Sequence, residues 1–197
     1  MSPLSKIIGL LQIDSTVGDL AGNAERLESL TAIAQANGAH VAIATELAVC
    51  GYPPRDLLLQ PDFITTSFET AKNLAVEIPV LVGTPIPPDH ERNLPANGVV
   101  RAGVLQAVPN KDNTNRVVAK KQLLPSYDVF DETRYFTPAN RSGICRSIGE
   151  IDLGITICED AWQAAGLTPS AYGQDPVASL AEWGRQGVSL NATVNLS

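Results

Sequence analysis

Lys6-Ile-Ile-Gly-Leu-Leu-Gln-Ile13 is the first of two apolar runs that together decide the fold. The second is Val41-Ala-Ile-Ala-Thr-Glu-Leu47, and the aliphatic character and short length of both runs predict buried strands. Between them Asn23 is a good helix cap, and the apolar residues after it recur at helical spacing until Asn37-Gly38. Strand, helix and strand in this order form the unit that builds parallel sheets. The first fifty residues therefore predict an α/β fold.

The rest of the chain predicts further elements of the same kind. Helices are expected over residues 63–76 and 176–185, strands over 79–84, 151–157 and 188–196, and a hairpin over 98–108 and 116–121. A proline-rich loop over 85–95 and an irregular stretch over 124–140 complete the pattern. Without a repeat or a domain linker, residues 1–197 predict one domain. Because the sequence ends on an apolar strand that would leave an open sheet edge, we expect this domain to be incomplete at its C-terminus.

Composition narrows the classes of protein. Apolar residues make up 44% and charged residues 18%, which is typical of a globular chain. The net charge of −7 and the lack of a Lys/Arg run argue against nucleic acid and against anionic membrane surfaces. No signal peptide and no apolar run of about 20 residues is found, so a soluble, cytoplasmic protein is expected.

The cysteines and histidines favour neither a disulfide framework nor a metal site. Cys50, Cys145 and Cys158 are an odd number at scattered positions, without a Cys-x-x-Cys pair. His40 and His90 do not stand at metal-ligand spacing from a cysteine. We therefore expect no metal and take Cys50 and Cys145 to be structural.

Three reactive side chains stand where predicted strands end. They are Glu46, Lys121 and, in the stretch Gly154-Ile-Thr-Ile-Cys-Glu-Asp-Ala-Trp162, Cys158. Active sites gather at strand ends in parallel sheets. Taken singly, each residue also has an ordinary interpretation: a partly exposed glutamate, a solvated edge lysine and an inert core thiol.

The sequence around these residues is more specific. It includes Glu46-Leu-x-x-Cys-Gly-Tyr-Pro-Pro-Arg-Asp-Leu57, Lys121-Gln-x-Leu-Pro-x-Tyr-x-Val-Phe-Asp-Glu-x-Arg-Tyr-Phe136 and Ile157-Cys-Glu-Asp-x-Trp162. With its Glu, Lys, Cys order, the chain resembles the nitrilase superfamily, and within it the glutaminase domain of glutamine-dependent NAD(+) synthetase. Ser126 departs from the asparagine usual there. No Ser-Gly-Gly-x-Asp-Ser motif of the synthetase domain occurs in the sequence.

The resemblance implies a four-layer α-β-β-α sandwich and hydrolysis of the side-chain amide of L-glutamine. Cys158 would be the nucleophile, Glu46 the general base and Lys121 the oxyanion stabiliser, whose charge would also favour the thiolate. Tyr127, Glu159 and Ser197 would line the glutamine pocket, although Tyr127 could merely be packed and Glu159 merely solvated. Glu132 is a candidate additional acid.

The resemblance also implies what the chain works with. The glutaminase step needs no cofactor, whereas ATP and nicotinic acid adenine dinucleotide belong to the synthetase domain that uses the ammonia. Partners would be that domain or a complementing chain, and a homo-oligomer is expected.

Other interpretations remain open at this stage. The chain could act on other amides or on nitriles. It could be an inactive folding or interaction module, because a sandwich without its last strands exposes apolar faces and strand edges, and we then expect weak or no turnover. A redox role for Cys158 would leave Lys121 and the long middle motif unexplained.

Overall fold

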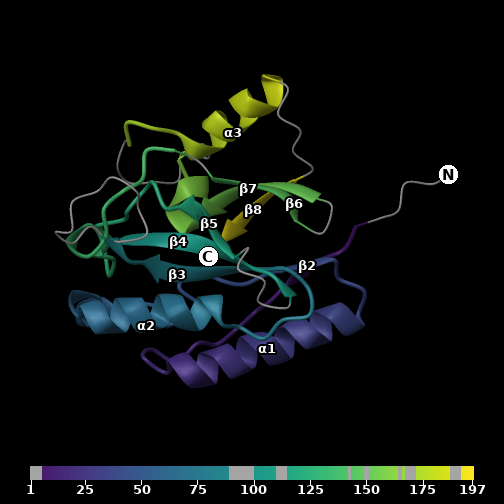
Figure 1. The fold of residues 1–197 in the computed structure, drawn as a ribbon. Helices are drawn as coiled ribbons and strands as arrows, with labels where there is room; N and C mark the ends of the chain where they lie inside the picture. Colours follow the sequence, from purple (N-terminus) through teal and green to yellow (C-terminus); the bar gives the residue numbers. More distant parts are fainter. Residues whose placement is uncertain are drawn as a thin grey trace.

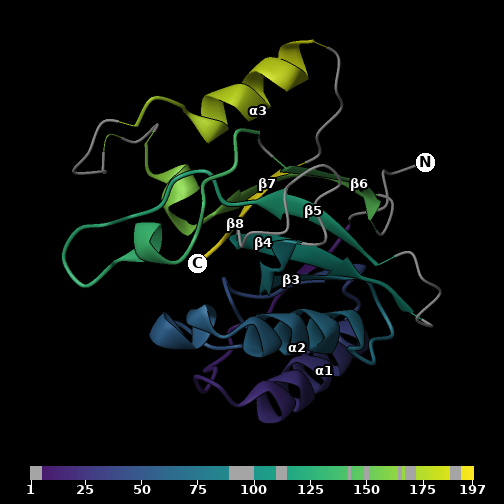
Figure 2. The ribbon, with the colours of Figure 1, turned by 60° about the vertical axis from the view of Figure 1, so that its left-hand side comes forward.

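The computed structural model describes residues 6–88, 100–109, 115–141, 143–148, 151–163, 166, 172–186 and 192–197. Two β-sheets lie face to face, and helices cover their outer faces, so the layers run α-β-β-α (Figure 1). The turned view shows the same order, with α1 and α2 below the first sheet and α3 beyond the second (Figure 2). The predicted four-layer sandwich is confirmed in this part of the chain.

The first sheet has five strands in the order of the sequence. They are β1 (Ile8–Leu10), β2 (Val41–Ile43), β3 (Val80–Ile86), β4 (Arg101–Ala107) and β5 (Arg116–Lys120). The first three are parallel, and β3, β4 and β5 pair antiparallel. The predicted strand–helix–strand unit and the predicted hairpin are therefore confirmed.

The second sheet contains β6 (Gly143–Ile148), β7 (Ile151–Ile157) and β8 (Ala192–Leu196). Strand β7 lies in the middle, antiparallel to β6 and parallel to β8. Where β6 meets β5, a Cβ on Gly143 would lie 2.2 Å from the Cβ of Ala119, a distance that no real side chain tolerates. Glycine at this position therefore lets β6 lie against β5.

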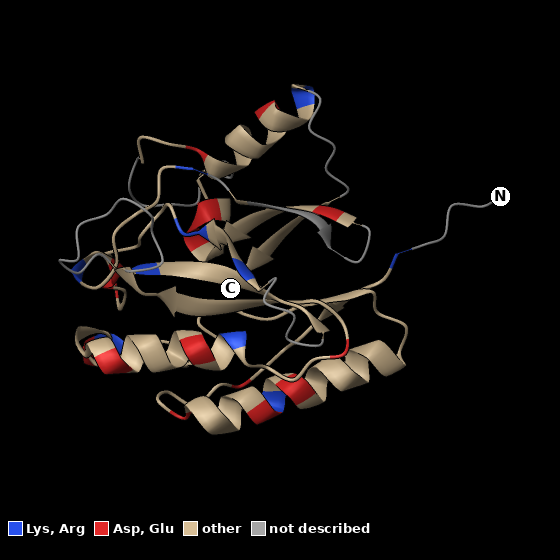
Figure 3. Cartoon of the chain, in the orientation of Figure 1, with Lys and Arg blue, Asp and Glu red and all other residues tan. Residues whose placement is uncertain are grey.

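The helices lie on the outer faces of the sheets. They are α1 (Leu20–Ala36), α2 (Pro61–Lys72) and α3 (Pro176–Arg185). Short 3₁₀ helices η1 (Arg55–Leu59), η4 (Glu132–Arg134) and η5 (Cys158–Ala161) lie in the connections. In Figure 3 the charged residues of α1 lie in its first half, and those of α2 lie toward its two ends. None of the helices in the described ranges is long and apolar enough to cross a membrane.

The core explains why the strands read as continuous apolar runs. Successive side chains of a strand point to opposite faces. Thus Ala42 packs in the cluster under α1 and α2, whereas Val41 and Ile43 pack against the second sheet. From the second sheet, Leu153 and Ile155 of β7 meet them. Both faces of the first sheet are therefore dry, as expected for parallel strands.

Several boundaries differ from the sequence-based expectations. Helix α1 begins at Leu20 and is capped by Asp19, so the prediction that Asn23 is the cap is wrong. Asn23 lies inside the helix, fully buried, where its Nδ2 donates to the carbonyls of Thr16 and Val49 at 2.8 and 3.0 Å. Strand β2 is shorter than residues 41–47 because the chain turns after Ile43.

Strand β6 was not expected, and its apolar content is too low to stand out in the sequence. The expected helix over 176–185 is confirmed with the same limits. Most of the expected loop over 85–95, the hairpin tip and residues 188–191 of the expected last strand lie outside the described residues.

Candidate active site

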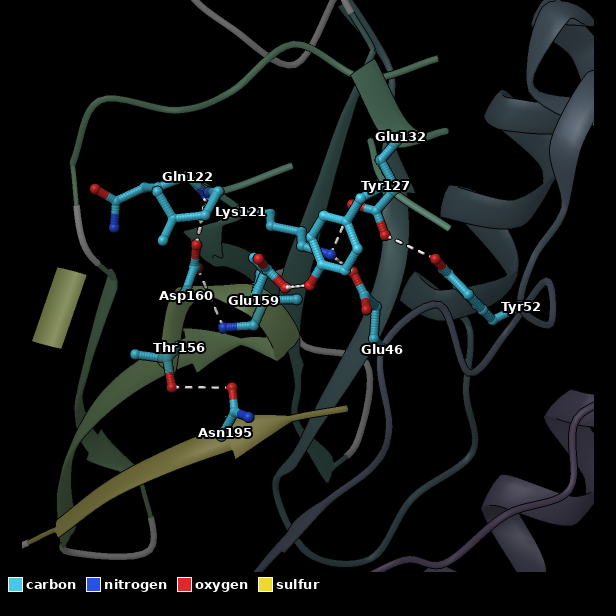
Figure 4. A network of polar contacts seen from close by, with 12 residues as sticks. Glu46, Tyr52, Lys121, Gln122, Tyr127, Glu132, Thr156, Glu159, Asp160 and Asn195 are labelled. Atoms are coloured by element: carbon cyan, nitrogen blue, oxygen red, sulfur yellow. Dashed lines mark hydrogen bonds and ion pairs between the residues drawn. The ribbon is translucent and has the colours of Figure 1, made fainter. Parts of the chain in front are cut away.

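Lys121 is the centre of a buried ionic cluster. It directly follows β5, and its side chain is 0% exposed. Its Nζ lies 2.8 Å from Oε1 of Glu46 and 2.6 Å from Oε2 of Glu132 (Figure 4). The hydroxyl of Tyr52 donates to the other oxygen of Glu132 at 2.9 Å. The interpretation of Lys121 as a solvated edge lysine is therefore wrong.

Glu46 reaches this cluster from a turn rather than from the end of a strand. It lies three residues after β2, and the next residue, Leu47, has a positive φ of 48°. Gly83 of β3 packs against this turn, where a Cβ would lie 2.4 Å from the nitrogen of Leu47 and 2.8 Å from Cα of Glu46. Only glycine allows this approach, so Gly83 helps to place Glu46.

Cys158 enters the site from the second sheet. It directly follows β7 and begins η5 with φ of 45°, a left-handed conformation that is strained for a residue with a side chain. It lines a cavity of about 360 Å³ together with Glu46, Tyr52, Phe130 and Ser197. Glu46 lies in the same cavity wall, and its charge acts on the thiol. The structure thus brings together the three predicted catalytic residues and places Ser197 in the same wall.

The thiol of Cys158 is held in its protonated form. Burial, followed by the negative charge of Glu46, raises the pKa of Cys158 to about 12, and Lys121 lowers it less than these two raise it. Lys121 thus favours the thiolate, as expected, but burial and Glu46 outweigh its effect on the pKa of Cys158. A base has to remove the proton as Cys158 attacks, and Glu46 lines the same cavity as that thiol.

Burial and the neighbouring charges shift the pKa values of both Glu132 and Lys121. Burial and the charge of Glu46 raise the pKa of Glu132 to about 7, although Lys121 opposes the shift. Burial by itself lowers the pKa of Lys121, but the charges of Glu46 and Glu132 outweigh it and the pKa is raised. The ammonium consequently stays charged, while Glu132 exchanges a proton near neutral pH.

A second polar cluster adjoins the first. Glu159 is 3% exposed, which excludes the interpretation of a solvated glutamate. Its carboxylate accepts a 2.8 Å hydrogen bond from the hydroxyl of Tyr127 and a 3.1 Å hydrogen bond from that of Tyr172. Figure 4 shows Tyr127 and Glu159 beside Lys121 and Glu46. Tyr172 was not predicted, because it lies outside the recognisable motifs.

Neighbouring charges in the middle motif have simpler roles. Arg134 forms an ion pair with Asp56, at 3.7 Å on the surface. Tyr52, which lies in the motif after Glu46, contacts Glu132. In the described part of the chain no group of three or more His, Cys, Asp or Glu side chains is arranged to hold a metal ion.

Known proteins are similar to this chain in sequence and in fold. No protein-family model matches the chain. The glutamine-dependent NAD(+) synthetase of Synechocystis sp. is 37% identical over 195 residues, which cover 96% of this chain and 33% of that protein. The one from Thermotoga maritima is 31% identical over 172 residues, covering 83% and 27%.

Solved structures agree with the fold. A glutamine-dependent NAD(+) synthetase from Acinetobacter baumannii superimposes with a TM-score of 0.72 at 23% identity, covering 96% of this chain and 32% of that one. An amidase from Nesterenkonia sp. AN1 in complex with acrylamide gives a TM-score of 0.62 at 18% identity, covering 82% and 59%. That amidase belongs to the nitrilase superfamily.

The chain has the fold of the nitrilase-superfamily amidase. In sequence it is similar to the glutamine-dependent NAD(+) synthetases along nearly its whole length. It spans about a third of the length of these relatives.

Proposed function

We propose that the cavity beside Cys158 hydrolyses the side-chain amide of L-glutamine to glutamate and ammonia. The observation that carries the proposal is the convergence of Glu46, Lys121 and Cys158 in one buried cluster. These residues come from three segments far apart in the sequence and from both sheets. A thiol, a base in contact with it and a fixed cation are the groups that acyl transfer requires.

The first half-reaction forms a thioester. Glu46 accepts the thiol proton while Sγ of Cys158 bonds to the amide carbon. Negative charge develops on the carbonyl oxygen, and the ammonium of Lys121 and a backbone N–H beside Cys158 stabilise it. As the carbon–nitrogen bond breaks, Glu46 returns the proton to the leaving nitrogen and ammonia is released.

The second half-reaction regenerates the thiol. Water attacks the thioester carbon, and Glu46 accepts one of its protons. When the carbon–sulfur bond breaks, that proton returns to Sγ and glutamate leaves. Glu132, hydrogen-bonded by Tyr52 and paired with Lys121, would keep the ammonium in place and serve as the additional acid of the site.

Recognition of glutamine would come from the second cluster. An α-ammonium group needs a buried carboxylate, and Glu159 offers one whose orientation two tyrosine hydroxyls hold. Ser197 lies in the wall of the cavity that contains Cys158, and its hydroxyl is available to the end of glutamine opposite the α-ammonium group. Asparagine is one methylene shorter and would not span both ends.

The ammonia would serve NAD(+) synthesis, in keeping with the names of the relatives. Amidation of nicotinic acid adenine dinucleotide with ATP would take place on a synthetase domain or a complementing chain, and the hydrolytic step itself would use no cofactor. We further propose a homo-oligomer in the cytoplasm as the working form.

Ammonia release from L-glutamine, L-asparagine and propionamide tests the proposal. We expect the chain to prefer L-glutamine, at whatever rate it reaches, and Cys158→Ala or Glu46→Gln to lower that rate at least about a hundredfold. In parallel, a diazoketone analogue of glutamine should alkylate Cys158 and be displaced by L-glutamine. Peptide mass spectrometry identifies the modified cysteine, with the fully buried Cys50 as internal control.

Two outcomes would overturn the proposal. Ammonia release that survives Cys158→Ala would remove the nucleophile. A chain that neither releases ammonia nor shows glutamine-protected labelling would support the other interpretation, an interaction module without activity. A preference for propionamide would instead point to a general amidase.

A further inference from the structure

Asp160 joins the two segments that carry the reacting groups. It is 2% exposed and lies in η5, two residues after Cys158. Its Oδ1 accepts hydrogen bonds from the backbone nitrogens of Gln122 and Leu123, at 3.0 and 2.8 Å. Its Oδ2 accepts a third bond from the nitrogen of Ile157 at 3.2 Å. Figure 4 shows the carboxylate between the two segments.

These bonds connect different sheets. Lys121 follows β5 of the first sheet, and Gln122 and Leu123 are the next two residues. Ile157 ends β7 of the second sheet, directly before Cys158. Between the sheets the contact is apolar, and apolar attraction has no direction, so it sets the distance between layers better than their alignment. Hydrogen bonds do have a preferred direction and length.

We propose that Asp160 is a positioning residue for the hydrolysis proposed above. Its hydrogen bonds hold the ammonium of Lys121 in place relative to the thiol of Cys158. The inference rests on that proposed function. The carboxylate of Asp160 is fixed to its own segment by the nitrogen of Ile157 and accepts two hydrogen bonds from the segment after Lys121, so a shift of one sheet along the other would break these two bonds to a buried charge. Such bonds are stronger than those between neutral groups.

The requirement is for a carboxylate and not only for a polar side chain. Three N–H donors point at two oxygens, and a carboxylate can accept all three. The amide of asparagine has one oxygen, so in Asp160→Asn its NH₂ group would face at least one N–H donor. The side chain fits the same space, which makes this change a test of the bonds rather than of volume.

A second contact holds the same segment from its other side. Nε2 of Gln174 donates to the carbonyls of Gln122 and Ala139, at 3.3 and 3.2 Å. The nitrogen of Ala139 in turn donates to the carbonyl of Lys121 at 2.9 Å. Gln174 is only partly buried, so Gln174→Ala should fold while loosening the connection after Lys121.

The experiment compares Asp160→Asn with a matched control, Thr156→Val. Thr156 is equally buried on β7, and its hydroxyl contacts the carbonyl of Val194 and Oδ1 of Asn195, so its loss affects β8 and not Lys121. For Asp160→Asn we expect kcat for glutamine to fall about tenfold to a hundredfold with KM changed less than about threefold, since small misplacements act on the reacting step. Thr156→Val should keep both within about twofold.

A second measurement does not depend on glutamine turnover. Alkylation of Cys158 by iodoacetamide reports how well Glu46 reaches the thiol, and peptide mass spectrometry assigns the label. We expect Asp160→Asn to slow it about tenfold, Gln174→Ala about threefold, and Thr156→Val not at all. If the wild-type chain releases no ammonia, the proposed function fails. The alkylation rates of the variants still test whether Asp160 positions Cys158.

The inference is overturned in either of two ways. Asp160→Asn could lower thermal stability yet leave both kcat and the alkylation rate at the level of Thr156→Val, which would make Asp160 purely structural. If Asp160→Asn does not fold, Gln174→Ala decides: an alkylation rate equal to that of the wild type would end the case.

Discussion

The buried cluster around Lys121 and the ion pairs on the helices contain the same kinds of charges in different surroundings. The side chains of Lys121, Glu46 and Glu132 are 0%, 7% and 5% exposed. In contrast, those of Lys72 and Glu69, at the end of α2, are 33% and 47% exposed. Their distances of 2.8 and 2.9 Å are nearly equal. Proximity alone therefore does not distinguish a reactive centre from a surface pair.

The two kinds of ion pair differ in their access to water. An exposed pair is screened, and its net contribution to stability is about 0–1 kcal/mol. A buried ion loses its hydration, at an effective cost of several kcal/mol, and its partners only partly offset that loss. Retaining two carboxylates and one ammonium in a dry cluster is thus poor evidence for stability. It does make the cluster a candidate for chemistry, because burial shifts the pKa values of its members.

Removing the cation should have the largest effect. Lys121→Met leaves two buried carboxylates without their partner, so we expect the free energy of unfolding to fall by about 3–5 kcal/mol. Loss of the oxyanion donor should lower glutamine turnover about a hundredfold to a thousandfold. Urea denaturation and ammonia release measure the two effects. The neighbouring Lys120→Met is the control, and equal effects of both changes would contradict the special role of Lys121.

Removing the titrating carboxylate should have a smaller, pH-dependent effect. The folded pKa of Glu132 is raised from the model-compound value of 4.5 to about 7. Its contribution to stability is therefore fully present below the unfolded pKa and is lost as the pH rises through the folded one. Between about pH 4.5 and pH 7, wild-type stability should fall, and Glu132→Gln should flatten the part of the curve above about pH 6.

Thermal unfolding across this pH range checks the prediction. Burial also raises the pKa of Asp160, to about 6, so a dependence at lower pH should persist in Glu132→Gln. An unchanged slope near neutral pH in that variant would show that another group titrates there.

Removing a surface partner should have the smallest effect. Arg185 pairs with Glu182 near the end of α3, with side chains 74% and 44% exposed. For Arg185→Ala we expect a change of at most about 0.5 kcal/mol in the free energy of unfolding, and no change in glutamine turnover. Urea denaturation at low and at high salt measures it. A loss above about 2 kcal/mol would mean that exposure does not separate the two classes of ion pair.

Local sequence patterns predicted many of the strands and helices. The run around Val41, the hairpin over β4 and β5 and the helix α3 have clear periodicity, and the structure contains each of them. Asn23 shows where such patterns mislead. As a residue type it suits a helix cap, but tertiary contacts place it inside α1, where it binds the carbonyls of Thr16 and Val49. Nothing local in the sequence distinguishes these two uses.

By itself the sequence determined which side chains are chemically able to act and which segments are apolar on both faces. Glu46, Lys121 and Cys158 stand out because their flanking motifs are specific. Only the tertiary structure decided their protonation and their alignment. Tyr52, Tyr172 and Asp160 become partners of the site through contacts between distant segments, and burial between the two sheets raises the pKa values of Cys158 and Glu132. Desolvation is a property of the packed molecule, so no local pattern of residues encodes it.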